Sequence, residues 1–493
     1  MELSMSLQQI KELLEKYNLL IESNIIKDDT INYISFDSRD DQIVPSTLFF
    51  CKGLHYKEEY LINTLDKGVT CYIGERVYLD NINYFIVNDI RKAMIVVADT
   101  FYKQSYLDIE TVGITGTKGK TTVTYFLKNI LDRQLKGESA IISTIEVITG
   151  SRHEKSDLTT PEPLDLHKYF YETRYNNIKY LTMEVTSQSY KTRRVEGVKF
   201  KHGMFLNIGL DHISDLEHES FEDYFNCKLE LIKNCDDMVI NYNMDDYEIV
   251  KNTCIANNVK YITYGSTNRA DYYYTNVIKD DNGLIFTVVS DKYKFNERFK
   301  INMLGIFNVE NALSSIVMAL NMGVDKNIIK DGLEATYIPG RMNIVKNKGI
   351  TVIVDFAHNG LSFSKLYEAI KADFPNKNII SVGGIPGNRD EVRKRDFGVI
   401  VGMNSNKVII TTDSPAYDDP KDICNDIIKF MTNDNYEIIL DRKEAIKKAI
   451  DDACSNDVVV LIGKGDETFQ KINGKLVPYE TDLAIAKEFL EKK

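Results

Sequence analysis

The sequence lacks the features that would place it among secreted, membrane or fibrous proteins. Its seven cysteines are scattered without CxxC spacing, and an odd number in a chain this long is typical of free thiols in a reducing compartment. The N-terminus has no apolar h-region, and no apolar run is long enough to span a bilayer. There is no internal repeat or low-complexity tract. We therefore expect a cytoplasmic protein without membrane insertion.

The chain also has fewer positively charged residues, 61 Lys and Arg, than negatively charged ones, 73 Asp and Glu. The net charge of −12 argues against a nucleic-acid surface, because phosphate binding is usually driven by clustered Lys and Arg. An anionic nucleotide substrate would need local positive charge instead. The 493 residues, 43% hydrophobic and 27% charged, are too many for one core and fit about three domains.

The order of apolar segments predicts an α/β fold in three domains, residues 1–108, 109–337 and 338–493. The first domain begins with a short amphipathic helix from Leu7 to Tyr17, followed by strands at residues 33–36, 48–50, 71–73 and 84–87. The second has a helix at 121–135, strands at 140–143, 180–184, 202–206 and 238–241, an antiparallel insertion at 261–300, and a helix at 308–322.

The third domain repeats the strand–helix alternation of a parallel sheet. Strands are expected at residues 351–355, 379–383, 407–411 and 458–462, and helices at 362–372, 423–431 and 443–451. This alternation predicts a Rossmann-like domain.

A glycine-rich loop lies between an apolar strand and the start of a helix. It reads Gly113-Ile-Thr-Gly116-Thr-Lys-Gly119-Lys120-Thr121-Thr122. Glycines let backbone N–H groups approach phosphate oxygens, Lys120 supplies a point charge, and the Thr121 hydroxyl can ligate Mg²⁺. Five residues, rather than four, separate Gly113 from Gly119. The alternative is a turn that only caps a helix, but the context favours binding of ATP.

A second group of polar residues follows the next strands. Glu184 ends the strand at 180–184, and a carboxylate at that end, near a phosphate loop, is placed to bind Mg²⁺. Asn207, Asp211, His212 and Lys228 follow downstream. Each has an ordinary alternative role, as a capping, structural or surface residue. Together they predict a metal and phosphate site.

These segments resemble those of the Mur ligases, and the resemblance covers nearly the whole chain. The form Gly-Thr-Xaa-Gly-Lys-Thr-Thr is seen in Mur ligases and is similar to that of folylpolyglutamate synthetases. Other matching blocks are Asp37-Ser38-Arg39, Leu48-Phe49-Phe50, Thr159-Thr160-Pro161-Glu162, Arg194-Val195 through Lys228, Pro339-Gly340-Arg341, Asp355-Phe-Ala-His358-Asn359 and Gly463-Lys464-Gly465. The chain looks closest to the MurE branch, which adds a diamino acid to a nucleotide-linked peptide.

The resemblance implies a small N-terminal α/β domain, a central P-loop domain with a parallel sheet, and a C-terminal Rossmann-like domain. It also implies ATP and Mg²⁺ as cofactors, and UDP-N-acetylmuramoyl-dipeptide and a free diamino acid as substrates of a monomer. The residues matching the family's ATP site are Gly116, Thr117, Lys118, Gly119, Lys120, Thr121, Thr122, Asn308, Asn311, Arg341 and Asp355. Phe307 stands where many relatives have His.

Other roles follow from the same resemblance. The catalytic group would be Lys120, Glu184, His212 and Lys228, and the metal ligands would be Thr121, Glu184, His212 and Lys228 as a carbamate. A carbamate converts the lysine cation into an anionic oxygen ligand. The residues expected to hold the UDP-linked substrate are Ser38, Thr159, Thr160, Thr186 and Arg194.

The incoming amino acid is indicated by a short segment of the third domain. Relatives that add meso-diaminopimelate carry Asp-Asn-Pro-Arg, whose Arg pairs with a distal carboxylate, whereas this chain reads Asp413-Ser414-Pro415-Ala416. Lys-adding relatives carry Asp-Asp-Pro-Asn. We expect L-lysine, with Glu467 contributing acidic character and Arg393 pairing with the α-carboxylate; L-ornithine or meso-diaminopimelate stays open.

Two other functions remain as alternatives. A ligase resembling folylpolyglutamate synthetases could use the same ATP site on another carboxylate, but folate ligases lack the N-terminal domain with Asp37-Ser38-Arg39. A catalytically silent binding protein of the same fold is disfavoured by the retention of Lys120, Glu184, His212 and Lys228.

Overall fold

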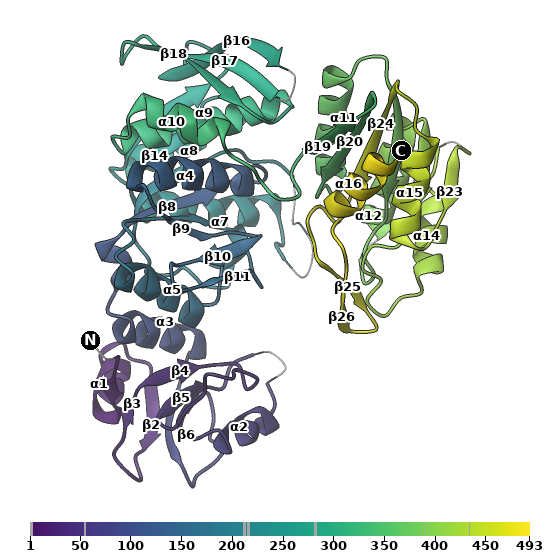
Figure 1. Ribbon diagram of the computed structural model, residues 1–493. Helices are drawn as coiled ribbons and strands as arrows, with labels where there is room; N and C mark the ends of the chain where they lie inside the picture. The colour runs from purple at the N-terminus through teal and green to yellow at the C-terminus, as the bar shows by residue number, and fades with distance from the viewer. Residues whose placement is uncertain are drawn as a thin grey trace. The chain divides into compact units, whose positions relative to one another are not determined.

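The structure, a computed structural model, describes residues 3–53, 56–210, 213, 217–280, 283–389, 391–432 and 434–493. The chain divides into two compact units, one made of Met1–Tyr272 with Ser314–Gly332 and the other of Tyr273–Leu313 with Leu333–Lys493. Figure 1 shows that each contains β-sheet covered by helices.

The N-terminal part of the first unit is a five-stranded sheet. Its spatial order is β2 (Leu20–Asn24), β7 (Asn83–Val87), β6 (Val69–Gly74), β5 (Thr47–Phe50) and β4 (Tyr33–Ser35). Only the β2–β7 pair is antiparallel. The remaining elements are β1 (Met5–Ser6), α1 (Leu7–Lys16), β3 (Thr30–Ile31), α2 (Glu58–Leu65), α3 (Ile90–Phe101) and η1 (Ser105–Asp108). The predicted opening helix and strands are confirmed.

The central sheet of the first unit carries the phosphate loop. Its strands lie in the order β11 (His153–Lys155), β10 (Glu146–Ile148), β9 (Ala140–Ile142), β12 (Tyr180–Glu184), β8 (Glu110–Thr115), β13 (Phe200–Phe205), β14 (Cys235–Asn241) and β15 (Lys260–Gly265). From β9 to β15 all neighbours are parallel. Central strands of a parallel sheet are buried on both faces, and every residue of β9 and β12 is buried.

Helices cover this sheet and supply the other residues of the site. They are α4 (Lys120–Leu135), α5 (Pro163–Tyr175), α6 (Ser187–Lys191), α7 (Phe221–Lys233) and α8 (Tyr247–Ala256). The helix predicted at 121–135 is confirmed as α4. The insertion predicted at 261–300 was partly wrong, because β15 pairs with β14 in parallel. The polar, Tyr-rich sequence of residues 261–300 had indicated antiparallel strands throughout.

The antiparallel strands belong to the second unit and begin later in the sequence. They are β16 (Tyr272–Asp280), β17 (Gly283–Ser290) and β18 (Phe295–Ile301), paired in sequence order. They are followed in the sequence by α9 (Ile306–Asn321) and α10 (Lys326–Glu334), of which residues 314–332 belong to the first unit. The helix predicted at 308–322 is confirmed as α9.

The remainder of the second unit is a six-stranded sheet. Its order is β19 (Asn343–Asn347), β20 (Ile350–Asp355), β24 (Asp457–Ile462), β21 (Asn378–Gly383), β22 (Lys407–Ile410) and β23 (Tyr436–Ile438). All neighbours except β19–β20 are parallel. The other elements are α11 (Gly360–Asp373), α12 (Glu391–Asp396), η2 (Phe397–Val401), α13 (Gly402–Asn404), α14 (Pro420–Ile428), α15 (Arg442–Asp452), β25 (Phe469–Ile472), β26 (Lys475–Pro478) and α16 (Asp482–Lys492). The predicted strands and helices are confirmed, and the sheet is Rossmann-like.

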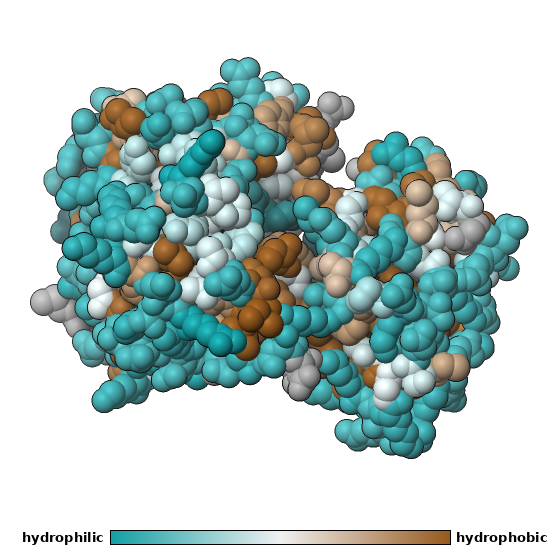
Figure 2. All heavy atoms as spheres, turned by 90° about the horizontal axis from the view of Figure 1, so that it is seen from above, coloured by the Kyte–Doolittle hydropathy of each residue, from teal (hydrophilic) through white to brown (hydrophobic). Residues whose placement is uncertain are grey.

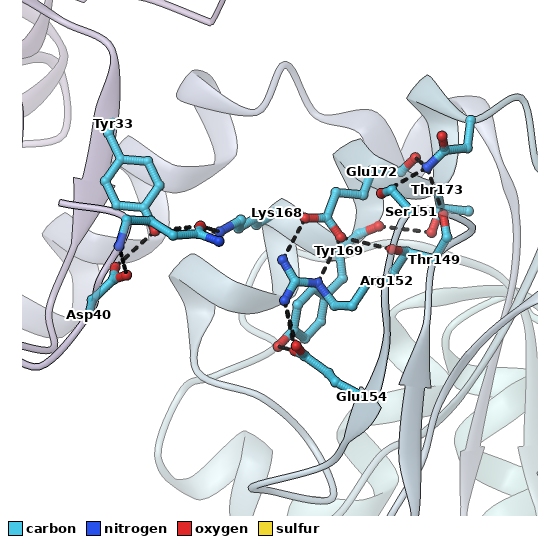
Figure 3. Close-up of polar contacts among 12 residues, drawn as sticks. Tyr33, Asp40, Thr149, Ser151, Arg152, Glu154, Lys168, Tyr169, Glu172 and Thr173 are labelled. Atoms are coloured by element: carbon cyan, nitrogen blue, oxygen red, sulfur yellow. Dashed lines mark hydrogen bonds and ion pairs between the residues drawn. The ribbon is translucent and has the colours of Figure 1, made fainter. Parts of the chain in front are cut away.

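Polar contacts tie the N-terminal sheet to the central part of the same unit (Figure 3). Lys168 on α5 donates to the Tyr33 hydroxyl at 3.4 Å and to Gln42 at 2.6 Å.

Within the central part, Arg152 holds Glu172 through two hydrogen bonds of 2.9 and 2.7 Å. The bidentate pair fixes α5 against the turn between β10 and β11.

Within the described residues, no helix is long and apolar enough to cross a membrane. On the face shown in Figure 2, hydrophilic residues cover most of the surface, with smaller hydrophobic patches among them.

Candidate functional site

The phosphate loop joins β8 to α4 and is held from both sides. Gly119 has a φ of +87° and directly precedes α4, a conformation that favours glycine. Asn207 clamps Lys118, because its side chain accepts from the Lys118 N–H at 2.9 Å and donates to the Lys118 carbonyl at 3.0 Å. A Cβ on Gly116 would lie 3.0 Å from the Leu206 side chain. Hydrogen bonds and close packing therefore hold the loop in one defined conformation.

Two lysine ammonium groups meet at this loop. Lys120 Nζ donates to the Gly116 carbonyl at 2.8 Å, and Lys228 Nζ on α7 donates to the same oxygen at 2.9 Å. Lys228 is only 2% exposed and lies over the Tyr224 ring, with Nζ 4.7 Å from its centroid. Two cations that converge on one carbonyl, Lys228 buried and Lys120 half-buried, provide the local positive charge that an anion requires in an acidic chain.

Glu184 ends β12 beside the phosphate loop. It pairs in register with Ile114 of β8, the strand that leads into the loop. Its carboxylate is 1% exposed and accepts from the Thr144 N–H at 2.8 Å and the Thr144 hydroxyl at 3.1 Å. These bonds fix the direction of a buried anion. His212, predicted as its partner, lies outside the described residues together with Asp211.

Threonine hydroxyls predicted to hold substrate are linked by hydrogen bonds around Glu184. The Thr159 hydroxyl lies 3.1 Å from that of Thr144, and the Thr160 hydroxyl donates to the Glu184 carbonyl at 3.0 Å. The hydroxyls of Thr160 and Thr186 are 3.2 Å apart. Arg194 Nη1 donates to the Thr160 carbonyl at 3.2 Å. The structure therefore brings this group together.

A cavity of about 310 Å³ joins these residues to the two lysines. Its lining residues are Lys120, Leu158, Thr159, Thr160, Thr186, Ser187, Gln188, Arg194, Glu217, Tyr224 and Lys228. Three cations, several hydroxyls, an amide and one carboxylate, that of Glu217, thus line one space, which suits an anionic substrate with several hydrogen-bonding groups.

Sequence reasoning missed several residues of this site. Tyr224 precedes Lys228 by one helical turn, a spacing that could have indicated a shared face. Glu162 is shared by two cations, because Lys52 bonds to one of its oxygens and Arg194 Nε lies 3.1 Å from the other. Lys52 also lies over the Phe36 ring, with Nζ 5.0 Å from the centroid. Ser38 is not among the cavity-lining residues, and its carbonyl accepts from Lys67.

The second unit holds the other residues predicted to bind ATP. Asn308 donates to the Leu304 carbonyl at 2.6 Å, and Asn311 donates to Asn308 at 3.2 Å. Arg341 lies over the Phe356 ring, with its guanidinium carbon 4.7 Å from the centroid.

Asp355 ends β20 in the same unit. Its carboxylate accepts from the backbone N–H groups of Met342 and Ala357 at 2.9 and 2.8 Å. Burial raises the pKa of Asp355, and Arg341 opposes this rise. The Asp355 carboxylate at the end of β20 thus lies near the Arg341 guanidinium.

The segment predicted to select the amino acid surrounds a buried lysine. Lys464 is fully buried and lies 2.6 Å from Glu467, 3.6 Å from Asp413 and 3.3 Å from the Ser414 hydroxyl. Burial raises the pKa of Glu467, while Lys464 opposes the rise. Asp413 and Glu467 therefore share one cation in a confined space.

The next residues of this segment shape its backbone. Pro415 is followed by Ala416, which has a φ of +55° and donates its N–H to the Lys471 carbonyl at 2.8 Å. Arg393 lies on α12, a different segment of the same unit.

Comparison with known proteins decides the family. The Mur ligase middle domain matches residues 114–319, and the Mur ligase, glutamate ligase domain matches residues 340–465. The chain is 37% identical over 509 residues to the UDP-N-acetylmuramoyl-L-alanyl-D-glutamate–L-lysine ligase of Enterococcus faecalis, with 100% of both chains covered. The chain belongs to the Mur ligase family.

Other Mur ligases support the same assignment. The chain is 38% identical over 465 residues to the UDP-N-acetylmuramoyl-L-alanyl-D-glutamate–L-lysine ligase of Streptococcus thermophilus, covering 94% of this chain and 93% of that one. The solved structure of a UDP-N-acetylmuramoyl-L-alanyl-D-glutamate–2,6-diaminopimelate ligase matches 99% of both chains with a TM-score of 0.65 at 23% identity. The predicted three-domain α/β Mur ligase architecture and the resemblance to the MurE branch are confirmed.

Proposed function

We propose that this Mur ligase uses ATP to add L-lysine to UDP-N-acetylmuramoyl-L-alanyl-D-glutamate during synthesis of the peptidoglycan precursor. The observation that carries the proposal is the cavity in which Lys120 and Lys228 share the Gly116 carbonyl beside Thr159, Thr160 and Arg194. A phosphate loop and a substrate anion site that open into one space are what phosphoryl transfer to a carboxylate requires.

The reaction begins when the substrate carboxylate attacks the terminal phosphorus of ATP and forms an acyl phosphate. Lys120 reduces the repulsion between these two anions, which is the main electrostatic obstacle. The lysine amine then attacks the acyl carbon, and the tetrahedral intermediate collapses to an amide and phosphate. Arg194 and the threonines hold the substrate so that its carboxylate points at the phosphate.

The donor set fits Mg²⁺, which prefers oxygen ligands. Glu184 offers a buried carboxylate fixed by Thr144, and Thr121 offers a hydroxyl at the start of α4. These two residues, with His212 and a carbamylated Lys228, would hold the metal. Bound Mg²⁺ would supply neutralising charge at the phosphates.

The choice of L-lysine rests on two observations. The two relatives described above carry L-lysine in their names. In this chain Asp413 and Glu467 already surround an ammonium group, that of Lys464, and the segment 413–416 lacks an Arg for a distal carboxylate. L-Ornithine and meso-diaminopimelate are the alternatives. A folylpolyglutamate-type reaction is disfavoured because the similarity extends through the N-terminal sheet.

The proposal includes the three domains 1–108, 109–337 and 338–493, with the first binding the nucleotide of the substrate. It also includes a monomer without membrane insertion and a cytoplasmic location. The location is supported by the cysteines, all seven of which are free.

Phosphate release tests the proposed function. The protein is incubated with ATP, Mg²⁺ and UDP-N-acetylmuramoyl-L-alanyl-D-glutamate, and L-lysine, L-ornithine and the diaminopimelate isomers are compared. L-Lysine should give the highest kcat/KM, with one tripeptide product for each phosphate. A preference for diaminopimelate would refute the lysine assignment. No amino-acid-dependent phosphate release would refute the ligase assignment.

A further inference from the structure

A serine, a histidine and an aspartate form a continuous hydrogen-bonded chain that ends at the cavity. Ser187 lines the cavity, and its Oγ lies 2.9 Å from Nε2 of His218. The other ring nitrogen, Nδ1, lies 2.8 Å from Oδ2 of Asp223. His218 is fully buried and Ser187 is 4% exposed. A buried imidazole with both nitrogens engaged is fixed in orientation.

The direction of the bonds follows from the chemistry of the partners. Asp223 accepts a second hydrogen bond from Lys191 at 2.7 Å, which lowers the pKa of Asp223 and keeps it ionised. A carboxylate only accepts, so Nδ1 of His218 must carry the ring proton. With the ring proton on Nδ1, the Nε2 lone pair accepts the hydrogen bond that the Ser187 hydroxyl donates. Ser187 therefore presents only lone pairs to the cavity.

We infer that Ser187, backed by His218 and Asp223, accepts the proton that the incoming amine must lose during amide formation. This step deepens the proposed function and rests on it. The neutral amine nitrogen forms a bond to the acyl carbon and becomes positively charged. Its proton passes to Ser187 Oγ while the Ser187 proton passes to Nε2 of His218. The C–O bond to phosphate then breaks, and phosphate leaves with the electron pair.

The position of Ser187, His218 and Asp223 beside the cavity supports this role. Ser187 and Lys120 line the same cavity, so the acceptor faces the space where the acyl phosphate forms. Asp223 stabilises the imidazolium that results, as the carboxylate of a Ser–His–Asp arrangement does. Ser187 is the residue that touches the reacting atoms, whereas His218 and Asp223 act through it and position it.

A change of nucleophile tests the inference. Free lysine has a basic amine whose adduct needs an acceptor, whereas hydroxylamine is weakly basic and its adduct loses a proton readily to water. With Ser187→Ala, kcat for tripeptide formation should fall by about 10²-fold, the usual contribution of a positioned proton acceptor. Hydroxamate formation and the KM for the UDP-linked substrate should change less than threefold. Asp223→Asn should show the same pattern more weakly.

A second histidine–aspartate pair provides the matched control. His202 Nδ1 lies 2.9 Å from Asp237 on neighbouring strands of the same unit, and it is not among the cavity-lining residues. His218→Gln should reproduce the selective loss with lysine, whereas His202→Gln should leave both products unchanged. Thermal unfolding of each variant identifies any loss that comes from misfolding, and Ser187→Ala decides the case if His218→Gln does not fold.

Several outcomes would overturn the inference. Equal losses of tripeptide and hydroxamate in Ser187→Ala, or no loss of either, would contradict a role in proton transfer. An acyl adduct on Ser187, detected by intact mass in the absence of amine, would make this residue a nucleophile instead. If the wild-type protein formed neither tripeptide nor hydroxamate, the proposed ligase function itself would fail, which separates that result from failure of the inference.

Discussion

Lys52→Met should weaken both the folded state and the binding of the UDP-linked substrate, because Lys52 shares Glu162 with Arg194. The side chains of Lys52, Glu162 and Arg194 are 11%, 14% and 18% exposed. Removing one partner of a buried pair costs about 3–5 kcal/mol, whereas exposed pairs contribute about 0–1 kcal/mol. The small residual exposure places the expected loss of unfolding free energy at about 2 kcal/mol.

Substrate binding should suffer for a related reason. Without Lys52, Glu162 interacts with Arg194 alone and competes with the anionic substrate for it. We expect the KM for the UDP-linked dipeptide to rise about tenfold, equivalent to about 1.4 kcal/mol, while kcat changes little. Steady-state kinetics and urea unfolding measure the two effects.

A double-mutant cycle isolates the interaction. Lys52→Met combined with Glu162→Gln should recover much of the KM, with a coupling energy of about 1–2 kcal/mol. Lys57→Met is the control, because Lys57 and its partner Glu59 are 65% and 61% exposed. It should change stability by less than about 0.5 kcal/mol. Strictly additive effects of the two substitutions, or an unchanged KM in Lys52→Met, would refute the reasoning.

Three further results are expected. Lys120→Ala should abolish ligation because it removes the cation of the phosphate loop; near-normal phosphate release would contradict this. Lys228→Ala should also be inactive but recover partly with small added carboxylates, which could replace the carbamate oxygens; full activity without them would exclude Lys228 from the mechanism. Burial opposes ionisation of Glu172, yet hydrogen bonds from Arg152 and Thr149 hold the pKa of Glu172 below its usual value. Its stabilisation is therefore present above the unfolded pKa of about 4.3 and is lost as pH falls through the folded pKa. In urea unfolding, Glu172→Gln should cost about 1–3 kcal/mol at pH 7, and this cost should shrink below pH 4; a cost independent of pH would contradict the account.

The elements of the fold that the sequence predicted well are those with strong local signals. The apolar strand β8, the glycine-rich loop and α4 were predicted because backbone geometry and phosphate chemistry both require that order. The strand β15 was misassigned because its polar, aromatic composition is typical of an exposed antiparallel strand, yet it pairs in parallel with β14. Strand direction depends on a partner far along the chain, which composition does not reveal.

The same distinction applies to the candidate site. Lys120 and Lys228 were predicted together through the family's motifs, and the structure places both ammonium groups on the Gly116 carbonyl. The pairing of Lys52 with Glu162 was missed, since the two residues are 110 positions apart and neither lies in a local pattern of charges. Such long-range pairs arise only when the N-terminal sheet packs against the central part of the unit.

The central claim is that the carboxylate held in the cavity attacks ATP itself. The most direct test uses UDP-N-acetylmuramoyl-L-alanyl-D-glutamate whose reacting carboxylate carries ¹⁸O at both oxygens, and the phosphate released during ligation to lysine is analysed by mass spectrometry. Transfer of one ¹⁸O atom to each phosphate is the expected result, because the acyl phosphate C–O bond breaks when the amine attacks. Phosphate without ¹⁸O, released alongside tripeptide, would contradict the account.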